Sequence, residues 1–413
     1  MNARAGRMRR GGYRGFGLAV AGAVVALGMA ACGSSPRGGA APAGGQGAGD
    51  AAGVAAASAS LGKYTGVSAI TAPGPRFEAP KARGKLVELV TQQAANPAVA
   101  TVTAALKAGL GQEGVTVQSC DAQGASVQIS GCIRQGLSQQ ANAVDVVGGD
   151  PAAYSDGLQA AEAAHVPVFS ALDVPLPSDA KATGADPSAL MPKLQGLAGN
   201  AAPPDPQSGK LEADFITQDS HGSASVLFIG SPGIVGSDYL QKAFLNETKR
   251  VCAGCSVETK NVTITNWASD LGPVVTAELT KNPKINYVVP VFDPMANYTD
   301  PAIKQLGKSG TVKVVTANGS LQQMEQLAQK DPVLVCEIGQ DLPQLGYIAA
   351  DQTLRKLAGA QPAAGSSAQV RVFTRSNINS IDASASAFRT GQWYTGSAAA
   401  LKGTFGKLWS GRS

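Results

Sequence analysis

Two cysteines separated by two residues, Cys252 and Cys255, are the side chains whose spacing most clearly suggests chemistry in this sequence. A CxxC pair is typical of a thioredoxin-like redox site or of half a zinc site. A redox site requires the first cysteine at an exposed helix N-terminus, whereas "ETKRVCAGCSVETK" places both cysteines in a turn after a helix. Zinc would need two further ligands, and the only histidines are His165 and His221. We therefore favour a structural disulfide over the redox and zinc alternatives.

The same two histidines are poor candidates for a catalytic base. His165 precedes a predicted strand and His221 lies in a polar turn, and neither belongs to a GxSxG or HExxH motif. No P-loop or GxGxxG follows a predicted strand, and the glycine-rich segments are linker or turns. We expect no enzymatic activity, no cofactor and no metal ion.

The first 31 residues have the pattern of an export signal. An apolar stretch of 17 residues, "GFGLAVAGAVVALGMAA", precedes Cys32. This stretch is too short to span a membrane. The basic part before it contains five arginines and no acidic residue: Arg4, Arg7, Arg9, Arg10 and Arg14. "MAAC" at 29–32 resembles the bacterial lipobox, with Met29 in place of the usual leucine. We predict a lipoprotein signal peptide over 1–31 and a lipid on Cys32; the alternative is an ordinary secretory signal. The Arg9-Arg10 pair is compatible with twin-arginine export.

The positive charge of the chain belongs to this signal. Removing residues 1–31 lowers the formal net charge from +5 to zero. A neutral mature chain gives no electrostatic support for binding nucleic acid, so we expect no nucleic-acid partner.

A segment rich in Gly, Ala, Ser and Pro follows Cys32 and extends to about Gly62. Such a composition buries too little apolar surface to offset its ordering entropy. We therefore predict a flexible tether over 32–83. The remaining body of about 330 residues is too long for one compact core and suits two lobes.

Cysteines beyond this signal lie outside the cytoplasm, where disulfides persist. Cys120 and Cys132 flank a predicted strand end and the middle of the following helix, so their closeness in sequence predicts a second disulfide. Cys336, within "PVLVCEIG", is interpreted as a free thiol in a buried strand.

The body alternates short β-branched runs with helical segments of 10–15 residues, which is typical of parallel sheets. The predicted strands are 85–91, 115–120, 143–149, 166–172, 225–231, 257–264, 285–291, 312–319 and 332–339. The predicted helices are 98–111, 126–141, 154–164, 209–219, 236–250, 268–282, 300–308, 320–329 and 343–358. We predict an α/β protein with two doubly wound parallel-sheet lobes.

A segment of little periodicity, residues 173–210, separates the two sets of strands. It marks the crossing from a first lobe, 84–208, to a second, 209–339. Open α/β sheets bind ligands beyond the carboxyl ends of their strands. Two such sheets that face each other across a hinge therefore place the ligand in a cleft between the lobes.

Three segments of the body resemble the type I (ribose-binding-like) periplasmic substrate-binding proteins, in particular their actinobacterial lipoprotein relatives. They are "QISGCIRQGLSQQANAVDVVGGDP", "HVPVFSALD" and "INYVVPVFDPMANYTDPAIKQLGKSG", and the two cysteine pairs look like those relatives as well. The resemblance spans about 84–375. It implies three crossings between the lobes, which assign about 340–365 to the first lobe and about 366–413 to the second.

The resemblance also implies candidate contacts to a solute, carried over position by position. They are Asn96, Asp173, Asp293, Asn318 and Glu337. Their planar polar groups suit neighbouring sugar hydroxyls. The chain departs from the pattern at Ala98 and Val99, where sugar binders often place stacking aromatics, at Phe292, where asparagine is frequent, and near Leu240, where an arginine is missing.

Four of these five candidates also have a structural interpretation. Asn96 with Pro97 is a normal helix start, and Asp293 a normal helix N-cap. Asn318 with Gly319 suits a tight turn, and Glu337 a charge at the surface end of a strand.

The function implied is that of a lipid-anchored receptor on the extracytoplasmic face of the membrane. It would deliver a small polar solute, a sugar or a similar molecule, to the permease of an ABC importer, and we expect it to be a monomer. The alternative is a lipid-anchored sensor of the same fold without transport.

Overall fold

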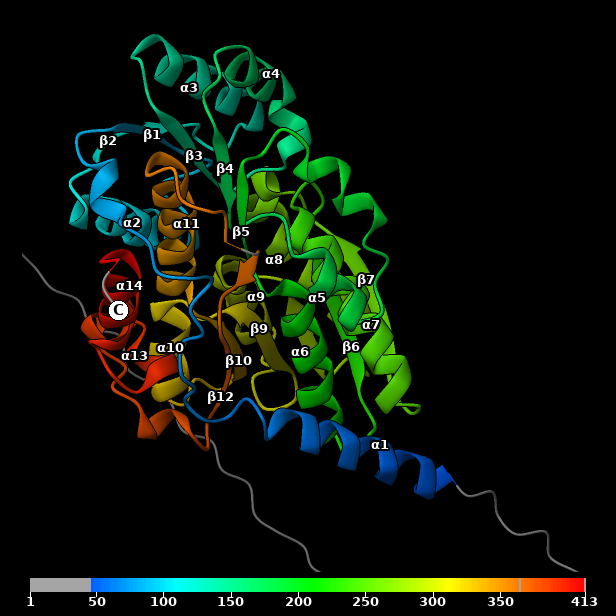
Figure 1. Ribbon diagram of the computed structural model, residues 1–413. Helices are drawn as coiled ribbons and strands as arrows, with labels where there is room; N and C mark the ends of the chain where they lie inside the picture. Colours follow the sequence, from blue (N-terminus) through cyan, green and yellow to red (C-terminus); the bar gives the residue numbers. More distant parts are fainter. Residues whose placement is uncertain (1–45, 364, 412–413) are drawn as a thin grey trace, which may run out of the picture. The chain divides into compact units, whose positions relative to one another are not determined.

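The structure is a computed structural model that describes residues 46–363 and 365–411. In this part of the chain, the strands form two six-stranded sheets with helices packed around them (Figure 1). The predicted signal peptide and the predicted lipidation site at Cys32 lie outside the described residues.

The first sheet has the strand order β11-β5-β4-β3-β1-β2, and all its pairs are parallel. Its strands are β1 (Leu86–Thr91), β2 (Thr116–Asp121), β3 (Ala143–Val147), β4 (Val168–Ala171), β5 (Gly199–Ala202) and β11 (Ser366–Ser367). Every residue of β3 is buried, as expected for a parallel strand covered on both faces. The predicted strands of this half are confirmed, and β5 and β11 are additional.

The second sheet repeats this arrangement with the order β12-β10-β9-β8-β6-β7. Its strands are β6 (Ser225–Gly230), β7 (Ser256–Asn261), β8 (Tyr287–Pro290), β9 (Lys313–Asn318), β10 (Leu334–Gln340) and β12 (Val370–Thr374). The edge strand β12 is antiparallel to β10, and the other pairs are parallel. The two doubly wound sheets of the prediction are therefore present.

Helices connect successive strands and cover the sheets (Figure 1). Those of the first half are α2 (Pro97–Gln112), α3 (Ser126–Ser138), α4 (Ser155–Ala163) and α5 (Pro177–Ala182). Those that follow are α6 (Asp205–Asp219), α7 (Val235–Val251), α8 (Trp267–Lys281), α9 (Asp293–Gln305), α10 (Leu321–Ala328) and α11 (Leu342–Leu357).

The body of the chain passes between the two sheets at three places. It leaves β5 through Pro203 and Pro204 into α6, leaves β10 through Asp341 into α11, and passes from β11 to β12 through residues 368–369. Helix α11 packs against α2 and so belongs to the first lobe. These are the three crossings that the resemblance implies.

The C-terminal residues depart from the predicted lobe boundary. Helix α14 (Ala400–Trp409) places Leu401, Phe405, Leu408 and Trp409 in the apolar core of the first lobe. Helices α12 (Ala385–Arg389) and α13 (Gln392–Thr395) pack in the core of the second lobe instead. The assignment of 366–413 to the second lobe is therefore wrong for α14, because the aromatic rings of Phe405 and Trp409 pack on Tyr347 of α11.

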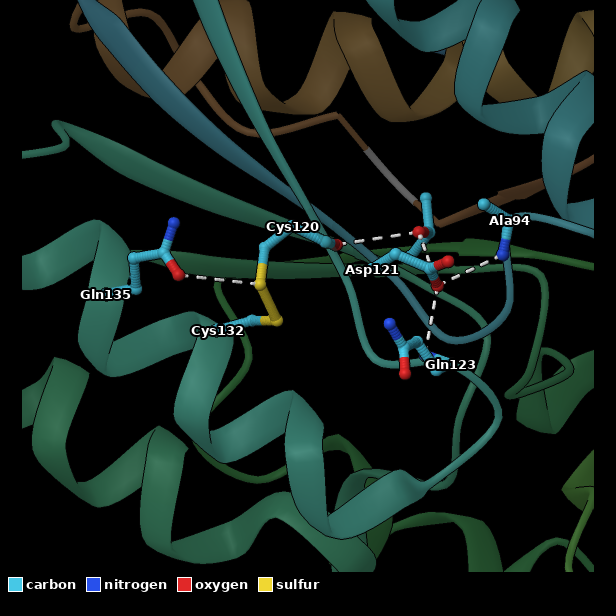
Figure 2. The surroundings of a disulfide bond; sticks show 7 residues. Ala94, Cys120, Asp121, Gln123, Cys132 and Gln135 are labelled. Atoms are coloured by element: carbon cyan, nitrogen blue, oxygen red, sulfur yellow. Dashed lines mark hydrogen bonds between the residues drawn. A yellow bond between two sulfur atoms is a disulfide. The ribbon is translucent and has the colours of Figure 1, made fainter.

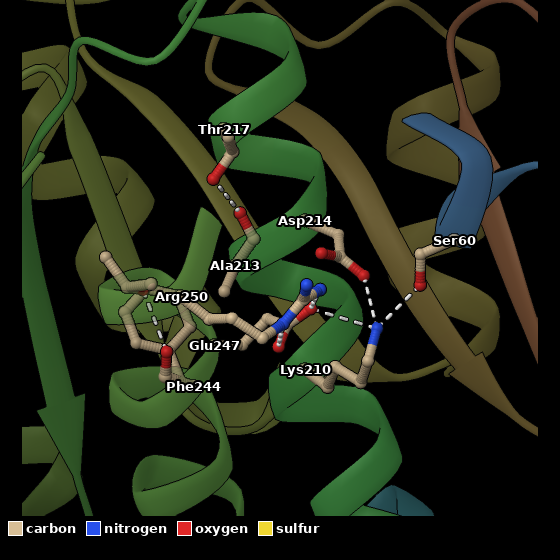
Figure 3. Close-up of polar contacts among 9 residues, drawn as sticks. Ser60, Lys210, Ala213, Asp214, Thr217, Phe244, Glu247 and Arg250 are labelled. Carbon is tan, nitrogen blue, oxygen red and sulfur yellow. Dashed lines mark hydrogen bonds and ion pairs between the residues drawn. The ribbon is translucent and has the colours of Figure 1, made fainter. Parts of the chain in front are cut away.

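The predicted flexible tether over 32–83 is wrong for residues Gln46–Leu61. Residues Gln46–Leu61 form helix α1, which packs on α6 and α7 (Figures 1 and 3). The composition allows this because alanine is the best helix former and small residues let backbones approach closely. Gly53 lies so near Val251 that a Cβ atom would overlap the Val251 carbonyl oxygen, and Ala57 is fully buried.

Both predicted disulfides are present. Cys120 at the end of β2 is bonded to Cys132 in α3 (Figure 2), and Cys252 is bonded to Cys255 between α7 and β7. Cys336 in β10 is fully buried and is bonded to no other described cysteine.

Within the described ranges, no helix is both long enough and apolar enough to cross a membrane.

Candidate functional site

A cavity of about 50 Å³ lies where the carboxyl ends of strands from both sheets meet. Its lining comprises Gln92, Asn96, Ala98, Val99, Gly148, Leu172, Asp173, Pro203, Asp205, Ile234, Ile264, Trp267, Phe292, Pro294 and Asn318. Three of the five predicted contacts, Asn96, Asp173 and Asn318, are in this lining. In this structure, the cavity has room for little more than a few water molecules.

The loop after β1 supplies Gln92 and Asn96. A carboxylate oxygen of Asp121, at the end of β2, accepts hydrogen bonds from the backbone N–H groups of Ala94 at 3.1 Å and Gln123 at 3.0 Å (Figure 2). Asn96 Oδ1 caps α2 by accepting from the N–H of Ala98 at 3.0 Å. The helix-start interpretation of Asn96 is therefore confirmed, and its Nδ2 group is the part left for a ligand.

The end of β4 supplies Leu172 and Asp173. Leu172 has a backbone φ of +68°. Residues other than glycine rarely adopt a positive φ, and those that do are found preferentially at functional sites. Asp173 is only 2% exposed, and burial, together with repulsion from Asp150 and Asp205, raises the pKa of its carboxyl group well above the usual range.

The second sheet contributes two aromatic rings. Trp267 opens α8, and its Nε1 donates to Ser231 Oγ at 3.1 Å and to the Val262 carbonyl at 3.2 Å. These bonds fix the orientation of the indole ring. Phe292 follows β8, and both side chains are more than 90% buried. The aromatic surface that the sequence lacks at residues 98 and 99 is thus supplied from the other lobe.

A hydrogen-bonded chain joins three polar residues at the ends of β9, β10 and the start of α6. Gln340 Nε2 donates to Asp205 Oδ1 at 2.8 Å, and Asn318 Nδ2 approaches Gln340 Oε1 at 3.5 Å. Burial raises the pKa of Asp205 to about 7. Asn318 has a φ of +139°, which accords with the tight turn that it forms with Gly319.

The other two predicted contacts, Asp293 and Glu337, do not line the cavity. Asp293 Oδ2 accepts from the N–H of Ser320 at 2.7 Å, and Glu337 Oε1 accepts from the N–H of Gly319 at 2.6 Å. Both carboxyl groups thus stabilise the turn after Asn318 by accepting hydrogen bonds from its backbone. The N-cap position of α9 belongs to Phe292, so the interpretation of Asp293 as the cap is wrong.

The interpretation of Glu337 as a surface charge is also wrong. Its side chain is fully buried because all seven residues of β10 are buried. Burial and the neighbouring Asp293 raise the pKa of Glu337 well above the usual range, while burial raises that of Asp293 to about 6.

Sequence reasoning missed Gln92 and Asp205 as lining residues. Gln92 directly follows a predicted strand, and this position was a signal that could have identified it. Asp205 lies in the Pro-rich stretch "AAPPDPQ", where neither periodicity nor a motif marks it. In the described ranges, no three His, Cys, Asp or Glu side chains are grouped so that they could hold a metal ion.

Comparisons with known proteins agree with this architecture. Residues 87–361 match the family described as periplasmic binding protein domain. The comparison with curated proteins gives no match.

Several solved structures share the fold. One is a 5-methylthioribose transporter solute binding protein from Thermotoga lettingae, with a TM-score of 0.64 and 18% identity over 81% of this chain and 100% of that chain. Another is an ABC transporter periplasmic solute binding protein from Actinobacillus succinogenes with bound D-allose, with a TM-score of 0.62 and 18% identity over 72% and 100% of the two chains. A third, from Mycobacterium smegmatis with bound glycerol, has a TM-score of 0.59 and 18% identity over 72% and 96%. At these identities the likeness establishes the fold alone.

Proposed function

Since this chain belongs to the periplasmic binding protein domain family, we propose that it is a receptor that binds a small polar solute between its two lobes and delivers it to an ABC importer. The observation that carries the proposal is the cavity, which is lined from the carboxyl ends of both sheets. Ligands of open α/β sheets bind at that edge. The neighbours with bound D-allose and glycerol support a sugar or polyol as the class of solute.

The lining suits such a solute. Gln92 and Asn318 offer amide donors and acceptors, and Asn96 offers its Nδ2 donor. Trp267 and Phe292 offer apolar faces against which a sugar ring packs. Leu172 and Asn318 both have a positive φ, and both line this cavity. Because such unusual backbone conformations are found preferentially at functional sites, they support a binding role for the cavity.

A screen of thermal stability against sugars, polyols, nucleosides and amino acids tests this function. A solute that binds the folded protein raises its stability by RT ln(1 + [L]/Kd), so we expect a concentration-dependent rise in Tm for at least one class. Ile234→Trp should abolish the rise because the indole ring would fill the cavity that Ile234 lines.

The matched control is Val127→Trp, because Val127 is 72% exposed and does not line the cavity. It should leave the rise unchanged. Equal loss in both variants, or a rise that persists in Ile234→Trp, would place binding elsewhere. The absence of a rise for every solute class would contradict the proposed function.

We also propose that the receptor is a monomer anchored to the extracytoplasmic face of the membrane by a lipid on Cys32. Support comes from the lipobox-like "MAAC" after an apolar stretch with a basic flank. Cys32→Ala protein should leave the membrane fraction. Retention in the membrane with unchanged processing would contradict the anchor.

A further inference from the structure

Two buried aspartates from different lobes face the same cavity. Asp173 follows β4 of the first lobe, Asp205 begins α6 of the second, and each is 2% exposed. One oxygen of Asp205 accepts from Gln340 Nε2, whereas Asp173 Oδ2 has no hydrogen-bond partner among the described residues. The cavity wall therefore carries two carboxyl groups, of which one has an unused buried oxygen.

These carboxyl groups lie near the first turn of α7. Asp205 Oδ2 lies against Gly236 so closely that a Cβ atom at Gly236 would overlap it, and the same Cβ position is 3.6 Å from the backbone oxygen of Asp173. The two carboxyl groups are also close enough to repel each other, because the charge of Asp205 raises the pKa of Asp173. Keeping both groups ionised in one buried place is unfavourable unless a positive charge lies close to them.

The positive charge available from the protein is too small. None of the described residues that line the cavity is lysine, arginine or histidine. The N-terminus of α7 contributes a partial charge of about +0.5, and the backbone of Val235 donates to Asp173. Lys193 lowers the pKa of Asp173 from outside the lining, but its ammonium group is already paired with Asp150. Two ionised aspartates would thus retain an uncompensated negative charge.

Resting on the proposed function, we propose that the solute carries a protonated amine, as in an amino sugar or an amino polyol, and that its ammonium group binds between Asp173 and Asp205. An ammonium group has three donors, and charged hydrogen bonds to carboxylates are the stronger kind. The aromatic rings of Trp267 and Phe292 suit a cation-bearing ring, because aromatic faces attract cations.

The rival explanation is that both aspartates are protonated and donate to the hydroxyl groups of a neutral sugar. Isothermal titration of the folded chain at pH 7.5 separates the two. The probes are matched pairs: glucosamine and glucose, galactosamine and galactose, mannosamine and mannose, and glucamine and sorbitol. We expect the amine to bind at least tenfold more tightly than its neutral partner in at least one pair, and its N-acetylated form to lose that advantage.

Asp205→Asn tests the aspartate directly, because the amide keeps an acceptor for Gln340 but removes the charge. It should reduce the preference for the amine by about tenfold or more, and Asp173→Asn should do the same if the first variant folds poorly. Asp156→Asn is the charge-matched control, since Asp156 is exposed on α4 and outside the cavity lining, and it should leave the preference unchanged.

Neutral sugars that bind as tightly as their amines would overturn this inference and leave the proposed function intact. A preference for the amine that both Asp205→Asn and Asp173→Asn leave unchanged would do the same. If no member of any pair binds and the wider solute screen also gives no rise in Tm, both the inference and the proposed function fail.

Discussion

The Nζ atom of Lys210 in α6 donates a hydrogen bond to Oγ of Ser60 in α1 at 2.6 Å (Figure 3). The same ammonium group lies 2.7 Å from Asp214 and 3.1 Å from Glu247 of α7. It therefore links α1 to two helices of the second lobe, and Leu61 extends the contact by packing in the apolar core of that lobe. Helix α1 is thus an integral part of the folded body.

Gly53→Leu should detach α1 and destabilise the protein. The new side chain would collide with the backbone of Val251, and forcing extra atoms into a packed contact typically costs about 1–3 kcal/mol. Urea denaturation should show this loss in the free energy of unfolding, and limited proteolysis should show new cleavage within residues 46–65. The control is Gly62→Leu at an exposed position. If Gly53→Leu resists urea and protease like the parent chain, the contact does not hold α1.

The two disulfides should contribute unequally to stability. The Cys120–Cys132 bond links residues 12 apart and the Cys252–Cys255 bond residues 3 apart. The chain-entropy model assigns about 3 kcal/mol to the longer loop and about 2 kcal/mol to the shorter. Replacing both cysteines of the first pair by serine should therefore lower the urea midpoint more than replacing those of the second. An inverted order would show that effects beyond loop closure dominate.

Cys336 should react with thiol reagents only after unfolding. It is fully buried, and burial raises its pKa, so the thiolate is neither accessible nor populated in the folded state. Labelling at Cys336 should therefore be negligible in the native protein, and unfolding in urea should add one group at this residue. Peptide mapping that links Cys336 to another cysteine would contradict this.

The sequence predicted most strands because β-branched runs such as "INYVVPV" identify buried parallel strands directly. It missed β5, because Gly199, Asn200 and two alanines have low strand propensity and pair only in a tertiary context. It missed α1 because composition alone does not show that Gly53 and Ala57 have a surface to pack on. The position of Glu337 was mistaken because a strand's end in sequence does not show what covers it in space. The place of Asp205 in the cavity lining was not predicted, because it depends on where the chain crosses between the lobes, and only the fold shows the path of that crossing.

The buried carboxyl groups should make the protein lose stability as pH rises. Burial raises the pKa of Asp145 to about 7, while its unfolded value is about 4. Between these values the unfolded chain releases a proton that the folded chain keeps, so each pH unit costs up to about 1.4 kcal/mol. Asp205, Asp300 and Asp341, each also raised to about 7, add to the effect.

Asp145→Asn should reduce this slope, because the amide does not titrate and still accepts the hydrogen bond from Thr353, which is 2.7 Å long. The measurement is urea denaturation between pH 4.5 and pH 7.5. The variant should be less stable relative to the parent at the lower pH and more stable at the higher. Glu162→Gln, at an exposed position on α4, is the control and should leave the slope unchanged. A slope unaltered by Asp145→Asn would show that Asp145 is ionised when folded.

Asn318 and Asp293 should separate binding from stability. Asn318 lines the cavity, so Asn318→Ala removes a side-chain partner of the ligand and should weaken solute binding by about one to two orders of magnitude. The same change should barely alter the Tm of the ligand-free protein, since the weak 3.5 Å contact to Gln340 is the side-chain bond it loses.

Asp293→Ala should act in the opposite way. It leaves the N–H of Ser320 without its acceptor in a buried place, which costs about 1–3 kcal/mol of stability, while the cavity lining keeps all its side chains. Titration calorimetry and thermal melts of both variants give the comparison. Equal losses of affinity would mean that Asp293 shapes the site through the turn it supports, and unchanged affinity in Asn318→Ala would mean that the solute binds away from β9.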